Sequence, residues 1–120
     1  MQNDLKDRTK QFALRVITLV ESLPPGLTSQ VIGKQLMRCG TSVAANYRAA
    51  CRARSQVEFI AKLGIVIEEA DEACFWLEIV TARNILESTL VEPLLRESNE
   101  ITAIMVASVN STRKSKRFSS

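Results

Sequence analysis

Histidine is absent from this 120-residue sequence, and cysteine, glycine, proline and aromatic residues are all scarce. Without histidine, and without a closely spaced cysteine pair, the chain lacks the ligands that zinc sites and di-iron helical bundles use. Three widely spaced cysteines argue against a disulfide framework and fit small buried side chains in a reducing compartment. Because glycine and proline interrupt helices, their scarcity beside abundant Ala, Leu, Glu and Arg favours helix throughout.

Long apolar runs are missing as well. No window approaches the ~20 consecutive apolar residues of a membrane span, and the N-terminal segment is charged rather than built like a secretory signal. Neither a nucleophile–base pair nor a glycine-rich phosphate loop is present. The length and the 46% hydrophobic content suit one soluble domain. We therefore expect a cytoplasmic protein that has no membrane partner, is not an enzyme and uses no cofactor or metal.

Charge is distributed unevenly along the chain. Residues 1–57 carry nine Lys/Arg and three Asp/Glu, whereas residues 58–112 carry three and ten. The last segment, 113–120, adds four more Lys/Arg and no acid. A basic front half and an acidic second half that pack together would neutralise each other. The net charge of +3 is therefore weak support for nucleic-acid binding by itself.

Apolar residues recur every three or four positions in four segments, which predicts four amphipathic helices. They are expected at residues 4–22, 27–54 (beginning at Leu27 or Thr28), 56–85 and 88–111 (beginning at Ser88 or Thr89). The short connections between them predict an all-α, antiparallel up-down-up-down four-helix bundle. The third helix has the most regular apolar stripe, with a seven-residue period: Phe59, Leu63, Val66, Ala70, Ala73, Leu77 and Val80.

Two turns carry the signature of a capping box. In Ser55-Gln56-Val57-Glu58, the Ser55 hydroxyl can accept from the Glu58 N–H while the Glu58 carboxylate reaches back to the Ser55 N–H. Thr89-Leu90-Val91-Glu92 predicts the same arrangement at the start of the fourth helix.

The short turn at Ser55 makes the second and third helices antiparallel neighbours. Facing residues then have numbers that sum to about 110, given so short a connection. This register pairs Arg52 with Glu58 and Arg38 with Glu72, and sets Arg48 opposite Lys62.

Basic residues form two candidate nucleic-acid-binding sets, because Lys and Arg neutralise phosphates without reading sequence. One set follows the second helix: Lys34, Arg38, Arg48, Arg52 and Arg54. The other lies in segment 113–120, which has no core pattern and is expected to be a disordered tail behind a 1–112 bundle domain: Arg113, Lys114, Lys116 and Arg117. The alternatives are ion pairing within the chain for the first set and a solvated tail for the second.

The third helix also has apolar residues away from its main stripe, namely Ile65, Trp76 and Ile79. One helix of a monomeric bundle needs one buried face, so a second apolar face predicts packing between subunits. For Trp76, a place in the core is the alternative. On the second helix, Ser42 and Asn46 lie one turn apart beside the core. They are expected to form a structural polar contact, with each other or with Arg38, Glu69 or Glu72, and a ligand site is the alternative.

Segment 36–78, LMRCGTSVAANYRAACRARSQVEFIAKLGIVIEEADEACFWLE, closely resembles the bacterial four helix bundle protein family, also called the ribosomal-RNA intervening-sequence protein family. The resemblance implies an antiparallel four-helix bundle that assembles as a ring-shaped homopentamer. Members are encoded within intervening sequences of large-subunit ribosomal RNA genes. A distant branch, the accessory protein of diversity-generating retroelements, is similar to a pentameric barrel that binds a reverse transcriptase and nucleic acid. Many relatives have a mid-helix proline where this chain has 40–44, so Gly40 replaces that kink with at most a milder bend.

These observations predict a non-enzymatic, ring-like homo-oligomer, with a pentamer favoured, that binds structured RNA or DNA as an accessory or scaffold factor. The alternative is an adaptor for a protein partner that has no nucleic-acid role.

Overall fold

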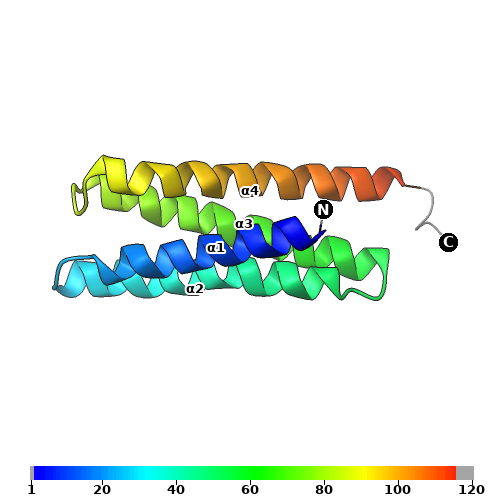
Figure 1. Ribbon diagram of the computed structural model, residues 1–120, viewed down its shortest axis with the longest axis horizontal. Helices are drawn as coiled ribbons and strands as arrows, with labels where there is room; N and C mark the ends of the chain where they lie inside the picture. Colours follow the sequence, from blue (N-terminus) through cyan, green and yellow to red (C-terminus); the bar gives the residue numbers. More distant parts are fainter. Residues whose placement is uncertain (1, 116–120) are drawn as a thin grey trace.

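The computed structural model describes residues 2–115, with side chains described from residue 4 onward. It contains the helices α1 (Gln2–Glu21), α2 (Leu27–Cys51), α3 (Gln56–Ala82) and α4 (Ser88–Lys114), and no strand among the described residues. They form an elongated body of 53 × 20 × 19 Å (Figure 1). The predicted all-α, four-helix fold is confirmed.

Each helix packs against the next one along the chain, whereas α1 and α4 touch only lightly. Figure 1 shows the short connections at alternating ends of the body: 22–26 and 83–87 at the left, and 52–55 at the right. The first turns of α1 and the last turns of α4 lie in the half that holds the 52–55 connection (Figure 1).

The connection 52–55 is longer than predicted, because α2 ends at Cys51 rather than at Arg54. Ser55 has an extended backbone and its Oγ accepts from the Glu58 N–H at 3.1 Å, which confirms this half of the capping box. An extended Ser55 requires the chain to leave the helix beforehand, and this places Arg54 in the connection. At its other end, α3 stops at Ala82, and the left-handed Asn84 (φ 54°) keeps the helix from reaching residue 85.

α4 begins at Ser88, as predicted, but its cap differs from the prediction. Its N-cap is Glu87, with no side-chain capping bond, so the box predicted between Thr89 and Glu92 is wrong. The helix already includes Thr89, and a helical residue cannot act as the extended cap. α4 also continues to Lys114, two residues into the predicted tail, whereas 116–120 lie outside the described residues.

The core is a single cluster that runs the length of the bundle. All members of the predicted α3 stripe are buried except Phe59, which is half-buried against the core. Among the described residues, the two buried polar side chains both have partners: the Thr9 Oγ1 donates to the Leu5 carbonyl within α1, and the Ser98 Oγ donates across to the Ala70 carbonyl of α3, each at 2.8 Å. These polar positions therefore interrupt the apolar stripes without leaving unpaired groups.

α1 and α2 approach each other closely at two glycines of α2. A Cβ added to Gly40 would lie 2.8 Å from Val16 Cγ1, and one added to Gly33 would lie 3.2 Å from Val20 Cγ1. The absence of a side chain at these two glycines therefore allows α1 and α2 to pack closely.

Candidate nucleic-acid interface

Arg38 of α2 is held by two acids of α3. Its guanidinium lies 3.1 Å from a Glu69 carboxylate oxygen and also pairs with Glu72, so the predicted Arg38–Glu72 pair is confirmed. This guanidinium, together with the Trp76 indole N–H at 3.1 Å, lowers the pKa of the Glu72 carboxyl. Because Arg38 is engaged within the chain, it is not available to a phosphate without breaking these bonds.

The second predicted pair, Arg52 with Glu58, is wrong: both residues are described, and no ion pair joins them. Because α2 ends at Cys51, Arg52 is the C-cap residue, whose N–H donates to the Ala49 carbonyl at 3.1 Å. Its side chain instead lines a groove on the α1 side of α2.

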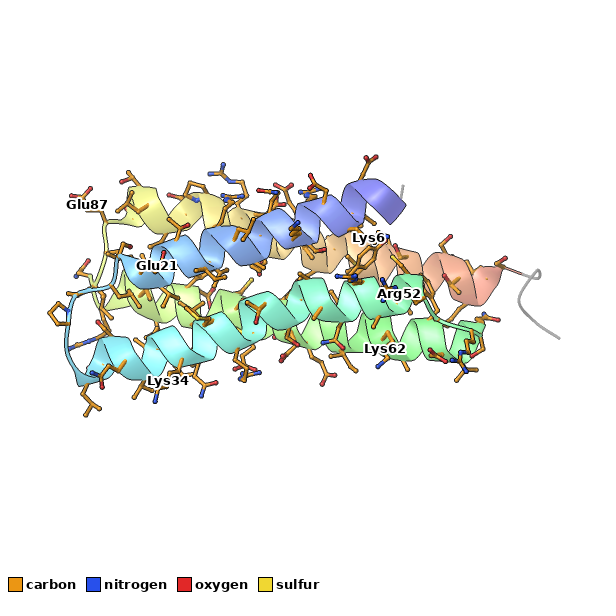
Figure 2. All side chains as sticks on the ribbon, turned by 60° about the horizontal axis from the view of Figure 1, so that its bottom comes forward. Lys6, Glu21, Lys34, Arg52, Lys62 and Glu87 are labelled. Atoms are coloured by element: carbon orange, nitrogen blue, oxygen red, sulfur yellow. The ribbon has the colours of Figure 1, made fainter. Side chains whose placement is uncertain are left out.

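This groove, between α1 and α2, has a volume of about 600 Å³. Figure 2 shows Lys6 of α1 and Arg52 of α2 near each other, in the half of the body that holds the 52–55 connection. Four cations line the groove against one acid, so its potential is positive. The lining residues are Lys6, Asp7, Lys10 and Ala13 of α1, and Thr41, Ala44, Ala45, Arg48 and Arg52 of α2.

Arg48 belongs to this groove as well. The hairpin register sets it opposite Lys62, but Arg48 lines the α1 side of α2, whereas Lys62 is on α3 (Figure 2). Lys6 and Lys10 were not among the predicted binding residues. They are a basic pair four residues apart on α1, and their link to Arg48 follows only from the packing of α1 on α2.

Within residues 4–115, only two cations take part in ion pairs, Arg8 and Arg38. Arg8 joins α1 to α4 by donating to the Glu97 carboxylate at 2.7 and 2.8 Å and to Glu100 at 2.7 Å. The Arg8 guanidinium lowers the pKa of the Glu97 carboxyl. The four cations of the α1–α2 groove are thus free of ion pairs within this part of the chain.

The remaining basic residues of the second-helix set lie away from the groove. Lys34 is exposed toward the opposite end of α2 from Arg52 (Figure 2). Arg54 lines a smaller cavity of about 250 Å³, where the Gln56 Nε2 donates to the Thr112 carbonyl at 3.0 Å. That bond ties the start of α3 to the last turns of α4, so Arg54 shares an end of the bundle with the C-terminus of α4.

Two of the four basic residues in segment 113–120 lie in the described part of the chain. Arg113 and Lys114 are exposed in the last turn of α4, close to the cavity that Arg54 lines. Lys116 and Arg117 lie outside the described residues.

Ser42 and Asn46 bond to each other within α2. The Asn46 Nδ2 donates to the Ser42 Oγ at 2.8 Å and to the Ser42 carbonyl at 3.0 Å. Both residues are half-buried, and their mutual bond satisfies them without the charged groups of α3.

The second apolar face of α3 is only partly exposed. Ile65 is 38% exposed, whereas Trp76 and Ile79 are half-buried against the core. Phe75, which was not among the predicted interface residues, is 51% exposed and makes a T-shaped contact with Trp76, with ring centroids 5.0 Å apart. Residues 63–82 contain no Lys or Arg, so this face is acidic as well as apolar.

Cys39 and Cys74 have the properties of buried packing residues rather than of reactive thiols. Cys39 is buried, and desolvation raises the pKa of its thiol to about 12. Burial also raises the pKa of the Cys74 thiol. Across the described residues, no group of three or more potential ligand side chains is placed to hold a metal ion. None of the described helices is long and apolar enough to cross a bilayer.

Comparison with known proteins supports the resemblance seen in segment 36–78. A family model described as 23S rRNA-intervening sequence protein matches residues 1–107. A solved structure of a protein of unknown function from the S23 ribosomal protein family of Bacteroides thetaiotaomicron is similar, with 33% sequence identity and a TM-score of 0.84. The similarity covers 91% of this chain and 97% of that chain. No curated protein gives a significant match.

Proposed function

Because this chain belongs to the 23S rRNA-intervening sequence protein family, we propose that it is a non-enzymatic, oligomeric bundle protein that binds structured RNA as a cytoplasmic accessory or scaffold factor. One observation carries the nucleic-acid part: Lys6, Lys10, Arg48 and Arg52 gather in one groove, while the ion pairs of the described residues engage other cations. Cations that are grouped on one face and have no ion-pair partner can neutralise the backbone phosphates of a nucleic acid.

Such binding is governed by phosphate contacts rather than by base identity. Lys and Arg release counterions from the nucleic acid when they neutralise its phosphates, which makes the affinity fall steeply with salt. The groove offers no aromatic side chain that would stack on a base, so its lining supports backbone recognition. The basic end formed by Arg54, Arg113 and Lys114 would extend the same field.

A gel shift with a structured RNA hairpin tests this proposal. The double variant Arg48→Ala/Arg52→Ala removes two of the four groove cations and should weaken binding by about 100-fold at low salt, on the order of 1–2 kcal/mol per contact. The matched control, Lys34→Ala/Arg96→Ala, removes two exposed cations outside the groove and should change affinity by less than about threefold. Equal losses in both variants would show that net charge, not the groove, governs binding.

We also propose that antiparallel, up-down-up-down bundles assemble into a ring-like homo-oligomer, with a pentamer favoured. Connections at alternating ends of the body support the up-down order. The exposed Phe75, in contact with Trp76, and Ile65 on the same helix support contact between subunits, because an apolar patch on the surface can mark an interaction site. Trp76 and Ile79 would contribute the inner edge of that face.

Analytical ultracentrifugation tests the assembly. Phe75→Glu should give monomers that keep their helical circular dichroism, because this side chain faces solvent in the single chain. Trp76→Glu is a less selective change, since Trp76 also packs on the core and donates to Glu72. A wild-type chain that sediments as a monomer at micromolar concentration would refute the oligomer.

The alternative function, an adaptor for a protein partner, is favoured by the same face of α3. Its exposed Phe75 lies in segment 63–82, which contains acids and no Lys or Arg, and the nearby Arg38 is already paired with Glu69 and Glu72, so this surface is unsuited to nucleic acid. Stoichiometric co-purification of a protein, without nucleic acid and dependent on Phe75, would favour the adaptor over the RNA-binding function.

A further inference from the structure

The α1–α2 groove lies between two packed helices and is lined on two sides by cations. We propose that it takes a single polynucleotide strand, with the phosphates held between Lys6 and Lys10 on one wall and Arg48 and Arg52 on the other. This inference rests on the proposed RNA-binding function and specifies which form of RNA occupies the groove: an unpaired segment rather than the side of a helix.

The cations form two facing rows. Lys6 and Lys10 are one helical turn apart on α1, and Arg48 and Arg52 are one turn apart on α2, so neighbours in each row have Cβ atoms about 5–6 Å apart. A strand lying between the rows can place successive phosphates against both walls. A single inorganic phosphate would need only part of this set, which is why the arrangement favours a chain of phosphates.

The dimensions argue against a duplex in the groove. The axes of two packed helices lie about 8–10 Å apart, whereas the major groove of a DNA duplex alone is about 12 Å wide. A duplex would therefore contact the rim cations and remain above the floor. A single strand has only one backbone, and it can lie along the groove between the two helices, which has a volume of about 600 Å³.

The floor of the groove is built from small side chains. Ala13, Ala44 and Ala45 present only methyl groups, so sugars and bases can lie close to the helix backbones. The Thr41 hydroxyl donates to the Met37 carbonyl at 2.6 Å, which leaves its oxygen as an acceptor for a ribose hydroxyl.

The same floor provides a test that alters no charge. Ala44→Leu fills the groove, and Ala107→Leu on the exposed surface of α4 is the matched control. Ala45→Leu, at an exposed position of the floor, is a second variant in case Ala44→Leu lowers stability. The probes are a fluorescein-labelled oligouridylate of about 12 nucleotides, within the usual site size for single strands, and a fully paired RNA duplex of the same length.

Fluorescence anisotropy should show the oligouridylate bound at least about tenfold more weakly by the two floor variants than by wild type or Ala107→Leu. Duplex binding should change by less than about twofold, because the rim cations are untouched. If both floor variants bind the oligouridylate like wild type, the single-strand inference is overturned while the RNA-binding function survives. If wild type binds neither RNA, the proposed function itself fails.

Discussion

Replacing Gly40 by alanine tests the closest helix contact in the fold. The new Cβ would lie 2.8, 2.9 and 3.0 Å from Val16 Cγ1, Cγ2 and Cβ, which are distances that real Cβ atoms do not tolerate. Val16 is fully buried and β-branched, so it has no alternative rotamer into which it can withdraw. Overpacking of this kind costs about 1–3 kcal/mol, against a gain of about 1 kcal/mol from the better helix propensity of alanine.

Gly64 of α3 is the matched control, since a Cβ added there meets nothing within 4 Å. Gly64→Ala should therefore stabilise the chain by about 1 kcal/mol through propensity alone. The difference between the two variants isolates the steric cost, and about 1–3 kcal/mol in favour of Gly64→Ala is expected. In thermal unfolding followed by circular dichroism, each kcal/mol corresponds to a shift in Tm of about 4 °C.

A double-mutant cycle with Val16→Ala identifies the contact responsible. Truncating Val16 removes both methyl groups that the new Cβ would strike, so Gly40→Ala should cost much less in that background. The close-contact explanation fails if Gly40→Ala is as stable as Gly64→Ala, or if Val16→Ala leaves the cost of Gly40→Ala unchanged.

Three further predictions follow from single groups. Arg8 lowers the pKa of the Glu97 carboxyl, so their ion pair stabilises the fold above the unfolded pKa of about 4.3, and this stabilisation is lost as the pH falls. Arg8→Ala should lower the free energy of unfolding by on the order of 1 kcal/mol at pH 7. In urea unfolding at a series of pH values, the variant should lose less stability than wild type between neutral and acidic pH. A thiol reagent at neutral pH should modify the half-buried Cys51 first. The buried Cys39, whose thiol pKa is raised to about 12, should stay unmodified until the chain unfolds. A Cys51→Ser variant that still reacts rapidly would contradict this prediction. Asp7→Asn removes the acid that lines the groove, so it should strengthen RNA binding severalfold at low salt in a filter-binding assay. An unchanged or weaker affinity would argue against the groove as the RNA-binding site.

Much of the fold follows from local sequence signals. The seven-residue apolar period of α3 predicts its buried face, and the Ser55 cap predicts the turn between α2 and α3. The register set by that turn is sufficient to pair Arg38 with Glu72. These predictions hold because each depends on residues within one helix or on two helices joined by a short turn.

The groove was harder to predict because it depends on where α2 ends. The sequence places Arg52 inside the helix, facing Glu58, but the chain leaves the helix at Cys51 so that Ser55 can cap α3. A few residues at a helix terminus are the least certain part of a sequence-based assignment. The contribution of Lys6 from α1 was missed for a different reason: no capping signal defines the register of α1 against α2.

The central claim is that unpaired cations of the α1–α2 groove bind RNA phosphates, and the salt dependence of binding measures it most directly. For a single strand, the slope of log K against log[salt] is about −0.7 per phosphate neutralised, so four groove cations predict a contribution of about −2.8. Arg48→Ala/Arg52→Ala should make the slope shallower by about 1.4, and the Lys34→Ala/Arg96→Ala control should leave it unchanged. An affinity that does not weaken with salt, or a slope that is the same in wild type and in the groove variant, would contradict the account.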